Sequence, residues 1–307
     1  MIAAVVAAML NVGSPATASL AQTGYRIVDL GTLGGEQSRA VAVNNRGHVV
    51  GESQTPDGSW HGFLWRHGTM TDLGALLPTG VNNRDEIIGT FDYATTAYLW
   101  RDGKLIDLGN LGGPLNFPVA INDRGQVTGM SSTADNADVP FLWTAGRMRA
   151  VPLTWVSGIN NRTEISGGVF ESDSGHAAVY RRGTVTALGA GPQDRSSTRA
   201  INEAGWVAGW RWPAGGDRVR AALWRHGVVT DLGTLGGDYS ESLAVNNRGE
   251  VLGVSNNAPA SPERPFLWRA GVMTDLSEYG VAAATGINDS GEICGTMGLH
   301  AALYRPI

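Results

Sequence analysis

The chain has 307 residues, of which 42% are hydrophobic and 17% charged, a composition that indicates a globular protein and excludes a disordered one. Its 43 glycines predict many turns. The net charge of −5, with no run of Lys or Arg longer than two residues, argues against a nucleic-acid or anionic-membrane partner. The single cysteine, Cys294, excludes an internal disulfide and is expected to be a small buried side chain in a strand.

The N-terminal segment predicts export. Ile2 to Leu10 is an apolar stretch that is too short to span a bilayer as a helix. Two triplets that fit signal-peptide cleavage follow it, Ala16-Thr17-Ala18 and Ser19-Leu20-Ala21, although the usual preceding positive charge is absent. We therefore predict a signal peptide over residues 1–21 and a secreted, monomeric single domain over residues 22–307, with no membrane span.

One repeat of about forty residues recurs seven times along the rest of the chain. Each copy contains an asparagine, and successive asparagines are 38 to 44 residues apart: Asn44, Asn82, Asn122, Asn160, Asn202, Asn246 and Asn288. Ala or Gly stands two residues before each of them, and Gly stands seven residues after. The interval fits a four-stranded propeller blade, and the turns and short apolar runs that follow each asparagine indicate strands rather than helices.

In chain order the repeat predicts four strands, which we call A to D. Strand A ends at the asparagine, strand B carries the glycine, strand C ends in an aromatic residue, and strand D leads into Asp-Leu-Gly or a variant of it. Strand A is expected to be innermost, because its Ala or Gly suits the limited room near a propeller axis. The aromatic residues of strand C are expected to pack between blades, and they are Trp65, Trp100, Trp143, Tyr180, Trp224, Trp268 and Tyr304.

The two ends of the domain are complementary. The seventh copy stops at Ile307, after its strand C, and the domain begins with an unpaired strand D over Tyr25 to Gly31. Pairing these segments would close the ring and protect its sheet edges. The predicted fold is therefore an all-β, seven-bladed β-propeller of four-stranded antiparallel blades, closed by the N-terminal strand in the last blade.

The repeat resembles the HAF-repeat family of probable extracellular proteins. Asp-Leu-Gly-Thr-Leu-Gly-Gly occurs at Asp29 to Gly35 and at Asp231 to Gly237, with a near copy at Asp107 to Gly113. The family's His-Ala-Phe-Leu-Trp position is best matched by His61 to Trp65, and no copy carries His-Ala-Phe intact. The resemblance implies a repeat fold and an extracytoplasmic location, and it implies no activity.

Residues that recur in many copies are expected to serve the blade itself. The aspartate of Asp-Leu-Gly is expected to accept hydrogen bonds from backbone amides at its own turn. The histidines at the start of strand C, His61, His176 and His300, are expected to bond a neighbouring strand or turn. No Ser-His-Asp arrangement, Gly-rich phosphate loop or Cys/His metal spacing is present, so no catalytic residue, cofactor or metal is predicted.

Function is expected on the face formed by the B–C and D–A loops, since variable loops on a rigid scaffold are the usual place for binding residues. The fifth copy departs most, with Trp206, Trp210 and Trp212 on one strand face; we expect the first two to pack and Trp212 to be exposed. Aromatic residues beside charged ones suit flat polar ligands. The candidate ligand-binding residues are Asp57, Trp60, Asp92, Tyr93, Trp155, Glu171, Asp173, Arg211, Trp212, Arg220, Tyr239 and Arg264.

Three functions fit this sequence. The first is a non-catalytic module that binds an extracellular glycan or protein on the loop face. The second is a polysaccharide lyase or glycoside hydrolase, which would need acidic residues that converge at the channel mouth. The third is a structural or adhesive component of the cell surface.

Overall fold

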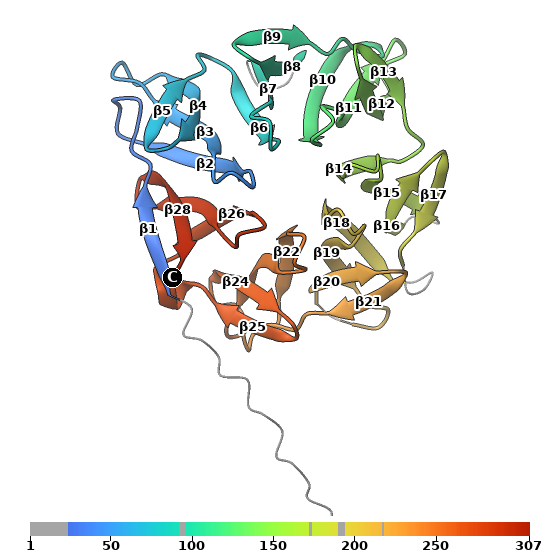
Figure 1. The fold of residues 1–307 in the computed structure, drawn as a ribbon. Helices are drawn as coiled ribbons and strands as arrows, with labels where there is room; N and C mark the ends of the chain where they lie inside the picture. Colours follow the sequence, from blue (N-terminus) through green and yellow to red (C-terminus); the bar gives the residue numbers. More distant parts are fainter. Residues whose placement is uncertain (1–23, 92–95, 172–173, 190–193, 217) are drawn as a thin grey trace, which may run out of the picture.

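Seven four-stranded antiparallel sheets stand around a central axis in the computed structural model, which describes residues 24–91, 96–171, 174–189, 194–216 and 218–307 (Figure 1). In every sheet the strands follow the order A, B, C, D from the axis outwards. The seven-bladed β-propeller predicted from the sequence is confirmed, and so is the inner position of strand A.

Strands A and B form the inner half of each blade. The A strands are β2 (Ser38–Val43), β6 (Leu77–Val81), β10 (Gly112–Ile121), β14 (Trp155–Ile159), β18 (Arg195–Ile201), β22 (Ser240–Val245) and β26 (Ala283–Ile287). The B strands are β3 (Val49–Gln54), β7 (Ile87–Phe91), β11 (Val127–Thr133), β15 (Ile165–Glu171), β19 (Val207–Trp212), β23 (Val251–Asn256) and β27 (Ile293–Met297).

Strands C and D form the outer half. The C strands are β4 (Trp60–Arg66), β8 (Thr96–Arg101), β12 (Asp138–Thr144), β16 (Ser174–Arg181), β20 (Arg220–Arg225), β24 (Glu263–Arg269) and β28 (His300–Pro306). The D strands are β5 (Thr69–Asp72), β9 (Lys104–Asp107), β13 (Arg147–Ala150), β17 (Thr184–Ala187), β21 (Val228–Asp231), β25 (Val272–Asp275) and, in the seventh blade, β1 (Tyr25–Asp29). A short 3-10 turn, η1 (Ser277–Tyr279), follows β25.

The N-terminal strand closes the ring. β1 pairs antiparallel with β28, in a register that runs from Tyr25 opposite Pro306 to Asp29 opposite Ala302. Beyond the ladder, the backbone N–H of Ile307 donates to the carbonyl of Gly24 at 2.9 Å. The predicted closure is therefore confirmed. Within the described ranges, no helix has the length and apolar character that a membrane crossing requires.

A separate apolar core lies between each pair of neighbouring blades. Between blades 7 and 1, for example, Leu303 and Cys294 pack with Val49, Phe63 and Trp65. The strand-C aromatics belong to these cores, as predicted: six of the seven are buried, and Trp100 is a half-buried member of the core between blades 1 and 2. Burial also raises the pKa of the Cys294 thiol to about 11, so this cysteine is a buried core residue as expected.

The recurring asparagines form a closed ring of hydrogen bonds around the axis. Each Asn Nδ2 donates to the backbone carbonyl of the corresponding asparagine in the next blade, at 2.9 to 3.1 Å, and Asn288 donates to Asn44 to complete the circle. We call this set the asparagine ring. It joins each A–B turn to the next one, which explains why the residue recurs in every blade.

The recurring glycine of strand B has an equally local cause. A Cβ at Gly51 would lie 2.1 Å from the carbonyl oxygen of Arg39 on strand A, and the corresponding distance in the other six blades is 1.9 to 2.3 Å. The close approach of strand A precedes a shift in the register between strands A and B. In blade 1 this shift lies between Ala40 and Ala42, and it occurs at the equivalent place in all seven A–B pairs. Glycine is therefore required at this position.

The recurring aspartate caps its own turn. Asp29 Oδ1 accepts from the N–H of Gly31 at 2.8 Å, and Asp72, Asp107, Asp231 and Asp275 do the same in their blades. Asp29 and Asp72 also contact the strand-C histidines, His300 and His61, at 3.0 Å. Both predictions, an aspartate bound to turn amides and histidines bound to a neighbouring strand, are confirmed for these residues.

Candidate functional site

Two adjoining cavities open on the loop face, one between blades 4 and 5 and the other on blade 5 itself. The first, of about 330 Å³, is lined by Trp155, Phe170, Gly175, Arg195, Ser196, Ser197 and Trp210. The second, of about 390 Å³, is lined by Arg195, Trp212, Pro213, Ala214, Gly215 and Gly216. Arg195, at the start of β18, belongs to both. We call the pair the aromatic cleft.

Trp155 forms the wall of the cleft on blade 4. A Cβ at Gly168 would lie only 1.9 Å from Cζ2 of the indole, so the ring occupies space that a side chain on β15 would otherwise fill. The other blades carry Glu, Thr, Met, Trp or Val at this position of strand B. Phe170, whose side chain is largely exposed, meets the Trp155 ring edge-on at 5.5 Å between centroids. The indole Nε1 is buried without a hydrogen-bond partner among the described residues.

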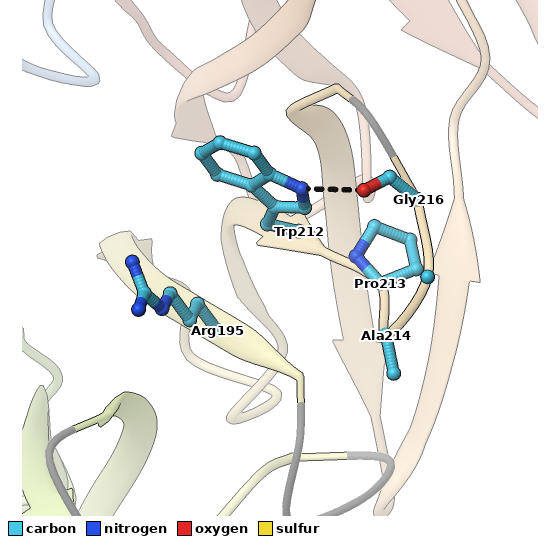
Figure 2. A pocket seen from close by; sticks show the side chains of 6 residues that line it. Arg195, Trp212, Pro213, Ala214 and Gly216 are labelled. Atoms are coloured by element: carbon cyan, nitrogen blue, oxygen red, sulfur yellow. Dashed lines mark hydrogen bonds between the residues drawn. The ribbon is translucent and has the colours of Figure 1, made fainter.

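Trp212 forms the opposite wall, on blade 5. Its indole Nε1 donates to the carbonyl of Gly216 at 2.9 Å, which fixes the ring against the following loop (Figure 2). The residue is 40% exposed, as predicted, so one side of the ring is open to solvent. Trp206 packs below the guanidinium of Arg225, at 4.4 Å from the ring centroid, which confirms the expected packing. Trp210 is half-buried and also lines the cleft.

Arg195 is the cation of the cleft. Its side chain is exposed and makes no hydrogen bond or ion pair with any residue that the structure describes. Arg211, by contrast, lies below the surface: its Nη2 is 3.4 Å from Asp194 Oδ2, and Asp194 also accepts from the N–H of Ala214. The Asp194–Arg211 pair thus supports the loop that carries Trp212, and it leaves Arg195 available for an anionic group.

The predicted residues on blade 1 lie apart from the cleft. Trp60 begins β4 and packs under the guanidinium of Arg39, at 5.1 Å from the ring centroid. Arg39 also pairs with Glu52, through Nε at 3.0 Å. Asp57 accepts from the Thr55 hydroxyl and from the Ser59 N–H within one hairpin, and these hydrogen bonds lower the pKa of its carboxyl. Its role in the structure is to hold a turn.

The predicted residues on blade 6 have partners of their own. The Tyr239 hydroxyl donates to Glu241 at 2.8 Å, and Arg199 of blade 5 donates to the same carboxylate. Burial and this carboxylate raise the pKa of Tyr239. Arg264 donates to Asp275 at 3.0 Å and so occupies the place that His61 and His300 take in their blades.

The structure brings together only part of the predicted set. Trp155 and Trp212 line the cleft, Arg211 lies beneath it, and Arg220 is paired in register with Arg211 at the start of β20. Glu171 is the last residue of β15, where it is paired in register with Ser174 of β16. Asp92, Tyr93 and Asp173 lie outside the described residues.

Sequence reasoning missed three contributors, Phe170, Gly168 and Gly175, and did not select Arg195 as a candidate. The sequence signal for this site is the Gly167-Gly168 pair of blade 4. In every other blade the recurring glycine of strand B is followed by a residue with a side chain, which is Trp210 in blade 5. Because Gly168 has no side chain, the Trp155 indole can occupy the space beside it.

No protein-family model matches the chain, and no curated protein matches it. Among solved structures it is similar to a streptogramin B lyase, with a TM-score of 0.57 and 11% identity over 92% of this chain and 98% of that one. The virginiamycin B lyase of Staphylococcus aureus gives a TM-score of 0.57 and 11% identity over 92% and 100% of the two chains. The β-propeller domain of the Trilobed protease of Pyrococcus furiosus gives 0.55 and 12% identity over 77% and 83%. These similarities show that the chain shares the β-propeller fold.

Proposed function

We propose that this chain is a secreted, non-catalytic binding propeller, and that it recognises an acidic glycan in the aromatic cleft between blades 4 and 5. The observation that carries this proposal is Arg195, an exposed guanidinium without a protein partner that stands between two cavities with indole walls. The resemblance to the HAF-repeat family supports the extracytoplasmic part of the proposal.

The chemistry of the cleft fits a sugar with a carboxylate or sulfate. The exposed faces of Trp212 and Phe170 offer rigid apolar area, which the apolar face of a pyranose ring can cover. A guanidinium binds a carboxylate or sulfate through two parallel hydrogen bonds.

The described lining residues favour binding over hydrolysis. None of the side chains that line either cavity, as far as the structure describes them, is an aspartate or glutamate. Glycoside hydrolysis uses a pair of carboxyl groups, one on each side of the scissile bond. Asp194, which lies close by, is engaged with Arg211 and Ala214.

Binding to immobilised acidic polysaccharides tests the proposal. We expect the untagged protein to be retained by at least one uronic-acid or sulfated polymer and not by dextran. Arg195→Ala should weaken that binding about 10-fold or more, because a hydrogen bond to a charged group contributes about 1.5–3 kcal/mol. Trp212→Ala should weaken it by a similar factor, through loss of the stacking surface.

Two variants control this experiment. Arg182→Ala is the control for Arg195→Ala: it also removes one arginine, but from the C–D turn of blade 4, on the face opposite the cleft. Trp60→Ala is the control for Trp212→Ala: it removes an indole from the loop face at blade 1, away from the cleft. Both should bind like the wild type. The proposal fails if Arg195→Ala and Trp212→Ala bind a retained polymer unchanged, if no acidic polymer is retained, or if a retained polymer is shortened by the protein.

A further inference from the structure

The junction between blades 1 and 2 departs from the pattern of the turn face, the side opposite the aromatic cleft. In blades 2, 4 and 6 the residue four positions after the ring asparagine is a glutamate that pairs with two arginines of its own blade: Glu86, Glu164 and Glu250. Blade 1 has His48 at this position. The carboxylate at this junction is that of Asp85 in blade 2, and it contacts His48. The position of Asp85 in the repeat is occupied by glycine in five of the other blades and by threonine in the sixth.

Asp85 fixes the orientation and tautomer of His48. The imidazole is buried, with 1% exposure, and its Nδ1 lies 2.8 Å from Asp85 Oδ1. The same carboxylate accepts from Asn44 Nδ2 and from Arg46 Nη1, each at 2.9 Å. Because an ionised carboxylate only accepts, the proton of His48 is on Nδ1, and Nε2 presents a lone pair.

His67 directs a second imidazole nitrogen at that lone pair. It lies in the C–D turn of blade 1, exposed and with a φ of 50°, and its Nε2 is 3.3 Å from Nε2 of His48. The rings are nearly perpendicular, at 83°. Without a metal, this distance of 3.3 Å fits a long hydrogen bond from the His67 N–H to the lone pair of His48. The same distance equals the separation, about 3.3 Å, of two nitrogens bound to one zinc at about 2.0–2.1 Å and the tetrahedral angle.

We propose that His48 and His67 form a binding site for a divalent transition metal of the Zn²⁺ or Cu²⁺ class. The Nε2 atoms are the two protein ligands, and Asp85 is the carboxylate that orients the buried imidazole, an arrangement typical of histidine metal ligands. The described residues contain no group of three or more His, Cys, Asp or Glu side chains placed to hold a metal. The remaining coordination positions therefore belong to water or to a donor from another molecule, which leaves the metal open to further ligands.

Titration of the untagged, chelator-treated protein with Zn²⁺, followed by isothermal calorimetry, tests this site. We expect saturable binding of one equivalent and a higher melting temperature in the presence of Zn²⁺, since a ligand that binds the folded state stabilises it. With Cu²⁺, electron paramagnetic resonance should show coupling to imidazole nitrogen. His67→Asn should abolish the saturable binding and the nitrogen coupling; asparagine suits the left-handed turn conformation and lacks the imidazole.

His226→Asn is the matched control, because His226 occupies the same turn position in blade 5 with a φ of 49°. It should bind Zn²⁺ like the wild type. Asp85→Asn should weaken binding about 10- to 100-fold, as loss of an orienting carboxylate does in other histidine sites. The proposal is overturned if the wild type shows no saturable binding, or if His67→Asn binds Zn²⁺ as tightly as His226→Asn. Melting temperatures without metal verify that both asparagine variants fold.

Discussion

Asn246 uses every polar atom of its side chain in a nearly fully buried place. Its Oδ1 accepts from the backbone N–H groups of Arg248 and Glu250 at 3.1 and 3.0 Å. Its Nδ2 donates to the Glu250 carboxylate at 2.6 Å and to the carbonyl of Asn288 at 3.0 Å. Only an amide side chain both accepts and donates in this way, and aspartate would lose both donated bonds. The chemistry of a single residue thus connects neighbouring blades.

We predict that Asn246→Ala lowers the free energy of unfolding by about 3 kcal/mol, because it leaves buried amide and carbonyl groups unpaired at about 1–3 kcal/mol each. The adjacent Asn247→Ala should cost about 1 kcal/mol or less, since Asn247 is exposed and water can replace its partners. Denaturant unfolding of the two variants measures the difference. Equal losses would show that the asparagine ring contributes little to stability.

Some residues of the aromatic cleft could be predicted from the sequence and others could not. Trp155 and Trp212 are predicted because aromatic residues beside charged ones in variable loops suit flat polar ligands, and this signal is local in the sequence. Gly168 and Phe170 were missed because their role depends on which side chain lies across the strand pair. The same holds for His48 and His67, which are 19 residues apart and meet only through the pairing of their blade.

At the scale of elements, the hairpin signals were sufficient to predict the blades. Asparagine and glycine at fixed intervals define each A–B turn, and the glycine on strand B reports a close approach of strand A. The register shift in every A strand was not predicted, because the residues at that position range from Val41 and Thr79 to Arg199 and share no chemistry. A backbone irregularity without a fixed residue type leaves no pattern to find.

The element on which the ring depends is β1. Its ladder with β28 covers the last strand edge, Leu30 beyond it is buried at 6% exposure, and Val28 packs against the core between blades 7 and 1. A chain that begins at Thr32 should therefore lose at least about 3 kcal/mol of unfolding free energy and aggregate through the exposed edge of β28.

A chain that begins at Gly24 is the control for this deletion. It retains β1 and should unfold at the same denaturant concentration as the full chain, as measured by tryptophan fluorescence, and light scattering should report aggregation only for the shorter chain. Equal stability of the two shortened chains would contradict the role assigned to β1.

At the scale of the whole molecule, an apolar core and a bond of the asparagine ring join each blade to the neighbour on either side. The fold could be predicted because the recurring asparagine, glycine and strand-C aromatic residue appear seven times, and each set lies within one repeat. The aromatic cleft could not be assembled in the same way, because it lies between two blades, and its residues come from parts of blades 4 and 5 that differ from the other copies.

Because the ring is closed, we predict that the chain ends can be moved to another blade. Gly24 and Ile307 are hydrogen-bonded neighbours, so a short Gly-Ser linker can join them. New ends between Arg182 and Gly183 would lie in the C–D turn of blade 4 and would make β17 the N-terminal closing strand, as β1 is in the natural order. We expect this circular permutant to fold with an unfolding free energy within about 2 kcal/mol of the natural chain, because the cost of closing a loop depends only weakly on its length.

A permutant opened between Arg46 and Gly47 should be much less stable. This cut lies in an A–B turn, where Asn44 Oδ1 accepts from the N–H groups of Arg46 and His48, and it frees one member of the asparagine ring. Thermal unfolding by circular dichroism compares the two permutants. If the one opened in blade 4 were the less stable, closure by a D strand would be tied to the seventh blade, and the blades would not be equivalent sites for closing the ring.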